Sequence, residues 1–454
     1  MLYDAWGREI TSKRPETREV AVSWIRDRLL DYPSERLTAS KLGMIFREAD
    51  QGNIFRQMEL FEEMEQKDTH LISIMQTRKS SVSGLPWEVT PASDSSQDKA
   101  IAADVKEMLE GLENFDESLH HLMDASGKGF SCLEIIWEVG KKYRIVEMKE
   151  KLQRRFTYFN MNFQEDILAL PRVLTPDQPV YGEELPPYKF VVHTYKAKCG
   201  TVPRSALFRP VAWMYLFKNY SIKDWVTFCE AYGMPMRIGK YDPATSNEDK
   251  DALIKAVTML GSDAAAVISN KTQIEIVESI KGTQGADVFK LFADFANEEM
   301  SKAVLGQTLT SGTGSKGGGH SLALGKVHDE VRGDIKKADA KALSRTVKNQ
   351  IIAGYVGYNY GFDKPLPVFR LMADDAKDLD SDIKRRAIGQ GMGYKFTAKD
   401  MSETFGWPLP ADGDETLEPI SGGANVQLND NGDGGDGGAY KAALKKNCLT
   451  SSRK

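Results

Sequence analysis

Hydrophobic positions are most regular between residues 205 and 233. One stripe follows a three-and-four spacing and consists of Phe208, Val211, Tyr215, Ile222, Val226 and Cys229. A second stripe beside it consists of Trp213, Phe217 and Tyr220. Pro210 is compatible only with a first helical turn, and Gly233 is a typical helix stop. The pattern predicts one helix about 40 Å long, at about 1.5 Å per residue, with two buried faces.

Charged side chains interrupt this helix on its remaining surface, where Lys218, Lys223, Asp224 and Glu230 lie. Each of these charges is costly in hydrocarbon, so the segment is not predicted to span a membrane. A helix with two apolar faces needs neighbours on both, either from its own fold or from other copies of the chain. On the pattern alone, a core helix of a large domain is the simpler interpretation.

The remaining pattern alternates between helix and strand. Residues 21–85 are predicted to be mainly helical, and Trp87 and Val89 alternate as in a strand. Two helices and a hairpin follow, at 99–112, 117–126, 131–139 and 143–147, with Gly140–Lys142 as the turn. Between residues 149 and 203 prolines replace the helical periodicity, which predicts a small β-rich excursion.

After the long helix the chain returns to mixed structure. Strands are predicted at 236–241, 265–269, 273–277 and 364–371, and Thr245 with Glu248 forms a capping box for a helix that ends near 260. Another helix, ending at 305, is marked by Val288, Leu291, Phe292, Phe295 and Ala303. A glycine-rich loop follows at 306–321, and Gly333 is a predicted bend in the charged helix after it. The predicted class is α+β, with a small helical unit at 378–405 and a disordered tail beyond Pro410.

Composition narrows the functional classes. The chain has 454 residues, 41% of them apolar, so it can form two or three domains with sizeable cores. Its net charge of −5 gives no global basic field for gripping nucleic acid, so DNA is expected to slide past the chain. The four cysteines form no CxxC pair, and no leader-like apolar segment is present, which favours a reducing, cytoplasmic site of synthesis.

Motifs for catalysis are weak. Gly312, Gly314 and Gly317 match GxGxxG, but a predicted helix precedes them, and Gly318 stands where a Walker A lysine is required. His120 and His121 are adjacent on a helix and cannot share one metal ion. We therefore predict no catalytic residue, no metal and no cofactor. The alternative is a soluble α/β enzyme that uses the Gly306–His320 loop to bind a phosphate-containing substrate.

Several longer stretches resemble the portal proteins of Mu-like tailed phages and prophages. They are FRQMELFEEMEQKDTHL within 49–71, SGLPWEVTPA at 83–92, FRPVAWMYLFKNYSIKDWVTFCEAYGMPMRIGKYD at 208–242 and FANEEMSKAVLGQTLTSG at 295–312. The resemblance covers most of residues 40–410. It implies a non-enzymatic protein with a portal-type fold, assembled as a ring of roughly a dozen copies around a channel for double-stranded DNA.

The resemblance also implies an organisation into stem, wing, clip and crown. The expected parts are an N-terminal helical region at 1–85, α/β wing parts at 86–148 and 234–305, a β-rich clip-like excursion at 149–203, a long stem helix at 204–233, a Gly-rich tunnel loop at 306–321, a long bent helix with its closing strand at 322–375, a helical crown-like unit at 376–410 and a disordered tail at 411–454. Residues 149–166 show no helical stripe that would supply a further stem helix before the clip.

Functional residues and partners follow from the same resemblance. The candidates that face the DNA channel are Thr313, Ser315, Lys316, His320, Lys218 and Lys223. The candidates for contacts between subunits are Trp213, Phe217, Tyr220 and Trp225. Expected partners are other copies in the ring, DNA passing non-specifically, the terminase large subunit, and capsid and head-tail connector proteins, with no membrane. The expected location is the virion, after assembly in the host bacterial cytoplasm.

Overall fold

The chain divides into two compact units, Met1–Asp375 and Ala376–Lys454. The computed structural model describes residues 3–4, 6–10, 14–22, 34–159, 170–233, 237–242, 244–259, 265–269, 282–308, 322–373 and 379–406. The predicted strand at 273–277, most of the Gly-rich loop and the predicted disordered tail lie outside these residues.

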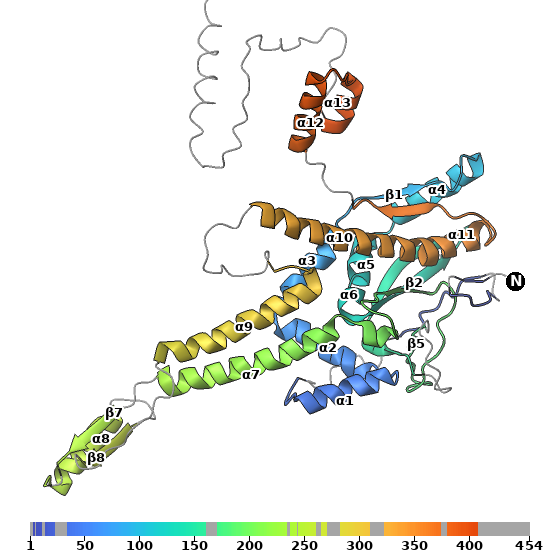
Figure 1. The fold of residues 1–454 in the computed structure, drawn as a ribbon. Helices are drawn as coiled ribbons and strands as arrows, with labels where there is room; N and C mark the ends of the chain where they lie inside the picture. Colours follow the sequence, from blue (N-terminus) through green and yellow to red (C-terminus); the bar gives the residue numbers. More distant parts are fainter. Residues whose placement is uncertain are drawn as a thin grey trace, which may run out of the picture. The chain divides into compact units, whose positions relative to one another are not determined.

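Three helices form the N-terminal part of the first unit (Figure 1): α1 (Ala39–Asp50), α2 (Phe55–Lys67) and α3 (Thr69–Ser83). The Asp68 carboxylate caps α3 by accepting hydrogen bonds from the backbone N–H groups of His70 and Leu71. Between residues 39 and 83 the prediction of a mainly helical region is confirmed.

A mixed layer follows. The strand β1 (Trp87–Thr90) pairs antiparallel with the distant β9 (Val368–Leu371). Helices α4 (Ser96–Glu110), α5 (Phe115–Leu122) and α6 (Ala125–Lys128) come next, and then the hairpin of β2 (Phe130–Val139) and β3 (Tyr143–Lys151). These elements lie where the sequence pattern predicts them, within a few residues at each end.

The segment 149–203 differs from the prediction of a separate β-rich excursion. Its strand β6 (Phe190–Thr194) pairs antiparallel with β2 and completes a three-stranded sheet of order β3-β2-β6. Shorter pieces, η2 (Gln153–Arg155), β4 (Phe156–Thr157), β5 (Arg172–Val173) and η3 (Val202–Ser205), surround this sheet. Among the described residues of this segment, the proline punctuation correctly predicts the absence of α-helix, but it does not show that β6 pairs with a strand about sixty residues earlier.

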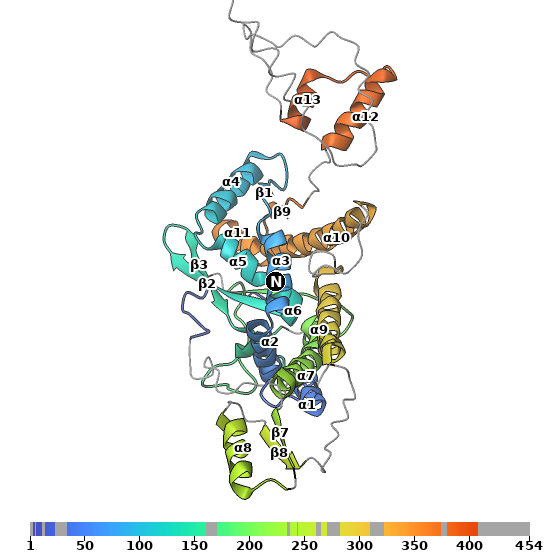
Figure 2. The ribbon, with the colours of Figure 1, turned by 90° about the vertical axis from the view of Figure 1, so that its left-hand side faces the viewer.

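The helix α7 (Phe208–Gly233) confirms the prediction of one long helix in this segment. It packs against α9 (Gly282–Leu305), and both views show the two side by side (Figures 1 and 2). The helices are antiparallel, because Phe228 near the end of α7 packs with a tilted ring against Phe289 near the start of α9, at 5.8 Å between ring centroids. At the other end, Val211 of α7 and Val304 of α9 share one core.

Between these two helices the chain forms a small β-α-β unit. The parallel strands β7 (Arg237–Tyr241) and β8 (Ala265–Ser269) are connected by α8 (Asn247–Met259). A helix is the usual crossover between parallel strands. The predicted cap at Thr245 lies one residue away from the observed one, because the Ser246 hydroxyl accepts the hydrogen bond from the Asp249 N–H.

The last long helix of the first unit is α10 (Leu322–Thr346), which continues through the π-helix η4 (Val347–Ile352) into α11 (Ala353–Tyr360). The hydrogen-bonding pattern is not interrupted at Gly333, where the sequence predicts a bend. The departure from α-helical geometry lies at η4 instead. There the Gln350 side-chain amide accepts a hydrogen bond from the Val192 N–H and donates one to the Val192 carbonyl oxygen. These bonds hold η4 against the free edge of β6.

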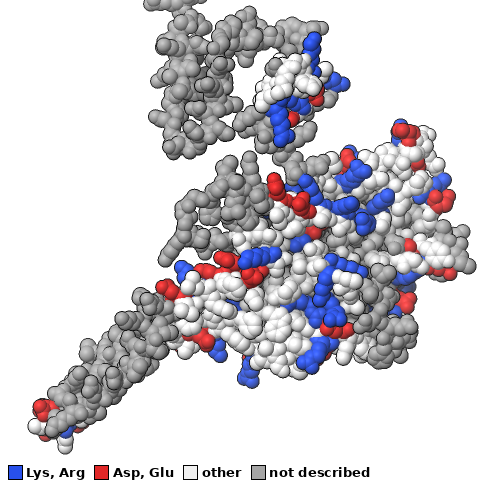
Figure 3. Space-filling model, in the orientation of Figure 1, with Lys and Arg blue, Asp and Glu red and all other residues white. Residues whose placement is uncertain are grey.

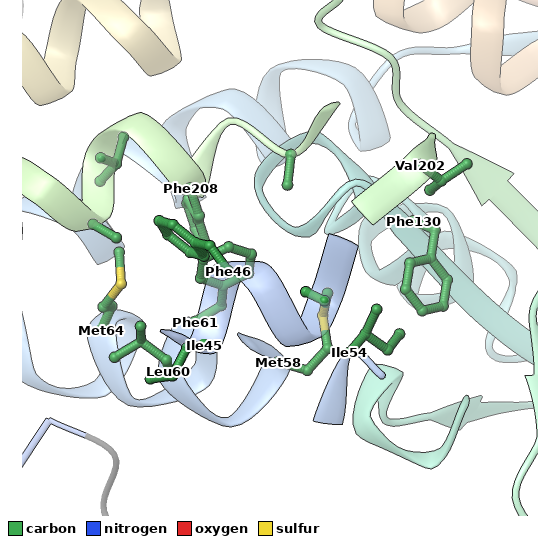
Figure 4. Close-up of a cluster of buried hydrophobic side chains, with 14 of the residues drawn as sticks. Ile45, Phe46, Ile54, Met58, Leu60, Phe61, Met64, Phe130, Val202 and Phe208 are labelled. Atoms are coloured by element: carbon green, nitrogen blue, oxygen red, sulfur yellow. The ribbon is translucent and has the colours of Figure 1, made fainter. Parts of the chain in front are cut away.

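Two hydrophobic cores stabilise the first unit. One joins α1, α2 and α3 to the start of α7 and the end of α9, and Figure 4 shows Phe46, Phe61 and Phe208 clustered there. The second core lies between α4, α5, the three-stranded sheet, η4 and α11.

The second unit contains two described helices, α12 (Leu379–Gly391) and α13 (Ala398–Phe405), as predicted for a small helical unit. Arg386 of α12 reaches α13 by an ion pair with Asp400 and by cation–π contact with Phe405.

Candidate functional site

The predicted channel residues of the Gly-rich loop, Thr313, Ser315, Lys316 and His320, lie outside the described residues. The loop's first residues are described. Gly306 has φ = +72°, and a Cβ atom there would lie 2.8 Å from the Ile335 Cδ1 atom of α10. The left-handed backbone conformation therefore favours glycine where α9 ends against α10, in agreement with the predicted helix stop.

Lys218 does not fit the predicted exposure to a channel. Its side chain is buried, and its ammonium group donates to both carboxylate oxygens of Asp68, at 2.9 and 2.8 Å. Asp68 also caps α3, so this ion pair fixes α7 to the N-terminal helices. Lys223, one turn further along α7, is exposed. Its contact with DNA stays a prediction.

The four predicted contact residues of α7 are not equally accessible. Trp213 is half-buried between Phe46 of α1 and Phe217, at centroid distances of 6.4 and 6.3 Å. Phe217 and Tyr220 are exposed, although the Tyr220 hydroxyl donates to the Leu37 carbonyl at 2.6 Å. Trp225 is half-buried. The aromatic stripe thus leaves two of its side chains accessible on the isolated subunit.

The apolar stripe of α7 changes its environment along the helix. Phe208, Val211 and Tyr215 are buried in the first core. Ile222 and Val226 continue the same helical face, but they are 38% and 53% exposed. The predicted burial is therefore met within the subunit only over the first part of α7.

A second exposed apolar surface lies on α9. Its spacing of i, i+3, i+4 and i+7 puts its members on one helical face. They are Val288 (58% exposed), Leu291 (66%), Phe292 (37%) and Phe295 (50%). The buried residues Ala296, Met300 and Val304 follow Phe292 at intervals of four residues, further along α9. The sequence pattern locates these residues on a helix, but it does not show that they point away from the core.

Polar contacts fix the other end of α9 to the body of the subunit. The Arg78 guanidinium of α3 binds both carboxylate oxygens of Asp339 and donates to the Val304 carbonyl at 2.7 Å. The carboxylate raises the pKa of Arg78, which burial alone would lower. His70 of α3 forms a hydrogen bond of 2.7 Å with Ser301. The helix pair is therefore held firmly at one end.

A buried group of charges lies between α2, α3 and α6. Asp124 accepts hydrogen bonds from Lys79, Lys128 and Gln153, and Glu65 pairs with Lys128 at 2.8 Å. Burial by itself raises the pKa of Asp124, but the two ammonium groups outweigh it and hold the pKa below its usual range. Each charge has a partner, so the group connects helices and is not arranged as an acid–base pair for catalysis.

No group of three potential metal ligands occurs among the residues that the structure describes. Within the same described part of the chain, no helix is long and apolar enough to cross a membrane.

Comparisons with known proteins agree with the resemblance. Residues 58–407 match the family described as the portal protein of Mu bacteriophage. The portal protein of Escherichia phage Mu is 31% identical over 418 residues, covering 89% of this chain and 78% of that protein. The Mu-like prophage FluMu protein gp29 of Haemophilus influenzae is 30% identical over 392 residues, covering 85% and 74%.

A solved structure is similar in fold. A chain of the virion of the native gene transfer agent particle superposes with a TM-score of 0.50 at 10% sequence identity. The superposition covers 78% of this chain and 94% of that one.

Proposed function

The chain belongs to the family of Mu bacteriophage portal proteins, and we propose that its copies form a ring whose central channel passes double-stranded DNA at one vertex of a capsid. The ring is inferred from the exposed apolar surfaces on α7 and α9. Large contiguous apolar surfaces on a soluble subunit are typical of contacts with other proteins.

The two surfaces are different, so a contact that joins them is heterologous. The α9 surface consists of Val288, Leu291, Phe292 and Phe295, whereas the α7 surface consists of Ile222 and Val226, which continue the stripe of Phe208, Val211 and Tyr215. A heterologous contact repeated around an axis closes into a ring when the rotation fits. In the proposed ring, the α9 surface of one copy packs on the α7 surface of the next.

The arrangement of the helices and strands leads to an assignment of stem and clip that differs from the one expected from the sequence. We assign α7 and α9 together as the stem, and the β7–α8–β8 unit between them as the clip-like part. This replaces the expected clip at 149–203, whose strand β6 belongs to the central sheet. The three-stranded sheet with α4, α5, α10 and α11 forms the wing, and α12 with α13 forms a crown-like unit.

Partners follow from the proposed role. A terminase large subunit would drive DNA through the ring, and capsid and head-tail connector proteins would hold it in the virion after assembly in the bacterial cytoplasm. We assign the chain no catalytic step. The alternative, a soluble enzyme with a phosphate-binding loop, receives no support from the relatives that match.

The test separates the two surfaces. An α9 variant carries Leu291→Asp and Phe295→Asp, and an α7 variant carries Ile222→Asp and Val226→Asp. Each variant alone has one damaged surface on every copy, so each is expected to be monomeric by light scattering. The unmodified chain is expected to form rings with a central hole in electron micrographs. An equal mixture retains one intact α7–α9 junction and is expected to give dimers of one copy of each.

Lys290→Asp is the matched control, because it changes an exposed residue of α9 outside the apolar surface. This control is expected to form rings like the unmodified chain. Compact solitary particles from the unmodified chain, or a mixture that stays monomeric, would contradict the proposed junction.

The Gly-rich loop is tested separately. Shortening Gly312–Gly319 is expected to leave rings intact and to reduce DNA packaging or retention in particles. Loss of assembly would instead show that the loop is needed to build the ring.

A further inference from the structure

A basic cleft lies between α10 and β9, away from the apolar surfaces of α7 and α9. Its volume is about 700 Å³. One wall is formed by α10 and the start of η4, and the other by β9. Its charged lining residues are Lys337, Lys341, Arg345, Lys348, Arg370 and Glu88.

The cleft has the opposite sign of charge from the chain as a whole. It gathers five cationic side chains and one carboxylate, whereas the whole sequence has a net charge of −5. On the face that Figure 3 draws, Lys and Arg side chains gather over α10 and the β1–β9 pair. A local concentration of one sign attracts counter-charged ligands even when the net charge of the protein repels them.

The cations form a row. Lys337, Lys341, Arg345 and Lys348 follow at intervals of four, four and three residues, which keeps them on one side of the helix. At about 1.5 Å per residue the row is about 16 Å long. A single small anion would occupy one or two of these groups, whereas a chain of phosphates occupies the whole row.

The π-helix extends the row. Lys348 and Asn349 of η4 line this cleft and also a second cleft of about 550 Å³, whose lining includes Lys364. The wider turn of a π-helix changes which residues share a face, and such segments are frequent at functional sites. The two clefts therefore adjoin along one side of the continuous helix from α10 to α11.

The lining also indicates which polyanion fits. Phe369 supplies an aromatic ring to the cleft, but it is 2% exposed, so it cannot stack on an unpaired base. An acidic protein partner would bury an apolar centre of its interface. Here Val368 is half-buried, Leu371 is buried, and Met372 is exposed, so one large apolar side chain of the lining is accessible. A row of cations with no accessible ring and a single accessible apolar side chain matches the backbone of a duplex better than the apolar centre of a protein interface.

We propose that the cleft between α10 and β9 binds the phosphate backbone of double-stranded DNA, independently of base sequence. This inference rests on the proposed function only in that a portal supplies the duplex. It identifies a binding surface on the wing, where the sequence as a whole predicts that DNA slides past the protein.

The test compares the assembled unmodified chain with three assembled variants for binding to a fluorescent 30-base-pair duplex of arbitrary sequence. The cleft variant carries Lys337→Gln, Lys341→Gln and Arg345→Gln. The control carries Lys106→Gln, Lys141→Gln and Arg144→Gln, which remove the same charge from exposed residues that do not line the cleft. A further variant, Lys337→Arg with Lys341→Arg, keeps the charge of the row.

The cleft variant is expected to bind at least about tenfold more weakly at 0.1 M salt. The slope of log K against log salt concentration is expected to become shallower by about 0.9 for each phosphate that the variant no longer neutralises, or about 2.7 for three. The control and the Lys→Arg variant are expected to bind like the unmodified chain. Circular dichroism and light scattering confirm that each protein is folded and in the same assembly state.

Equal affinity of the cleft variant and the control would overturn the proposal, as would the absence of binding by the unmodified chain. Fluorescent polyglutamate is measured in parallel. Cleft-dependent binding of polyglutamate without binding of the duplex would also overturn the proposal and indicate an acidic protein. Ring formation is measured separately by light scattering. Failure of the unmodified chain to form rings would contradict the proposed function, whereas DNA binding by the cleft is judged from the measured affinities.

Discussion

The two parts of the α7–α9 helix pair use similar apolar residues but differ in what covers them. In the proximal part, residues 208–220 of α7 and 296–305 of α9, Phe208 and Met300 are buried in a core shared with α1, α2 and α3. In the distal part, residues 221–230 and 287–295, Val226 and Leu291 are more than half exposed. Helical periodicity thus shows that a face needs covering, but not which molecule covers it.

The comparison predicts opposite consequences for the same kind of substitution. Proximal substitutions should lower the stability of the subunit, and distal ones should affect assembly alone. Stability is best measured in the α7 variant with Ile222→Asp and Val226→Asp, because assembly itself would stabilise the folded chain by mass action.

The largest effect is expected from Phe208→Ala. The Phe208 ring is fully buried and packs edge-on against Phe61, at 5.5 Å between centroids. Truncating a buried phenylalanine costs about 3–5 kcal/mol, through reduced burial and the cavity that remains. Urea denaturation measures the change in the free energy of unfolding. The matched control is Phe292→Ala in the exposed distal part of α9, and an equal loss of stability in both variants would contradict the contrast.

A smaller effect is expected from Lys218→Ala. This substitution leaves the Asp68 carboxylate without the ammonium group that pairs with it. Removing one partner of a largely buried ion pair should cost about 2–3 kcal/mol, since the α3 backbone still donates to Asp68. Lys223→Ala, on the exposed surface of the same helix, should change the free energy of unfolding by less than about 0.5 kcal/mol. Similar values for both lysines would argue against the buried pair.

A third test uses pH and concerns the body of the subunit. His193 of β6 is buried, and its ring forms a hydrogen bond of 2.8 Å with the Thr346 hydroxyl. Burial lowers the pKa of His193 to about 4, from an ordinary value of 6.5. As pH falls, the unfolded chain takes up this proton near pH 6.5 and the folded chain only near pH 4.

This contribution to stability is therefore complete above pH 6.5 and is lost as pH falls towards 4. Between pH 7 and pH 5 the loss should be about 2 kcal/mol. The urea midpoint of the His193→Gln variant is expected to depend less on pH over this range than the midpoint of the chain that keeps His193. An unchanged pH profile would show that His193 does not titrate in this way.

The smallest effect on stability is expected from Leu291→Ser alone. Its side chain is 66% exposed, so the free energy of unfolding should change by less than about 0.5 kcal/mol. The same substitution in the unmodified chain should weaken ring formation measured by light scattering, because it removes an apolar group from the proposed junction. A destabilised monomer with normal assembly would reverse the comparison.

Much of the local structure follows from local signals. The structure contains the helix that the three-and-four spacing around Phe208 predicts, and this helix ends at Gly233 as predicted. It also contains the predicted turn at Gly140–Lys142. These features depend on residues close together in the chain, whose backbone preferences act before any tertiary contact. The family was also recognisable from the sequence, because its motifs are contiguous stretches.

Long-range pairing was not predictable in the same way. The strand β6 joins β2, and Lys218 pairs with Asp68, which lies 150 residues earlier. Lysine is usually solvated, and no local pattern indicates the exception. The four cations of the basic row share one helical face by their spacing alone, but the cleft beside them forms only when β9 lies against α10.

The sequence by itself determined the long amphipathic helices, the strand positions and the membership of a family. The tertiary structure decided which apolar faces the subunit covers for itself, which lysine is neutralised and which cations gather beside a cleft. The physical reason is that periodicity depends on neighbours within about two helical turns, whereas burial and charge pairing depend on residues that only the folded chain brings together.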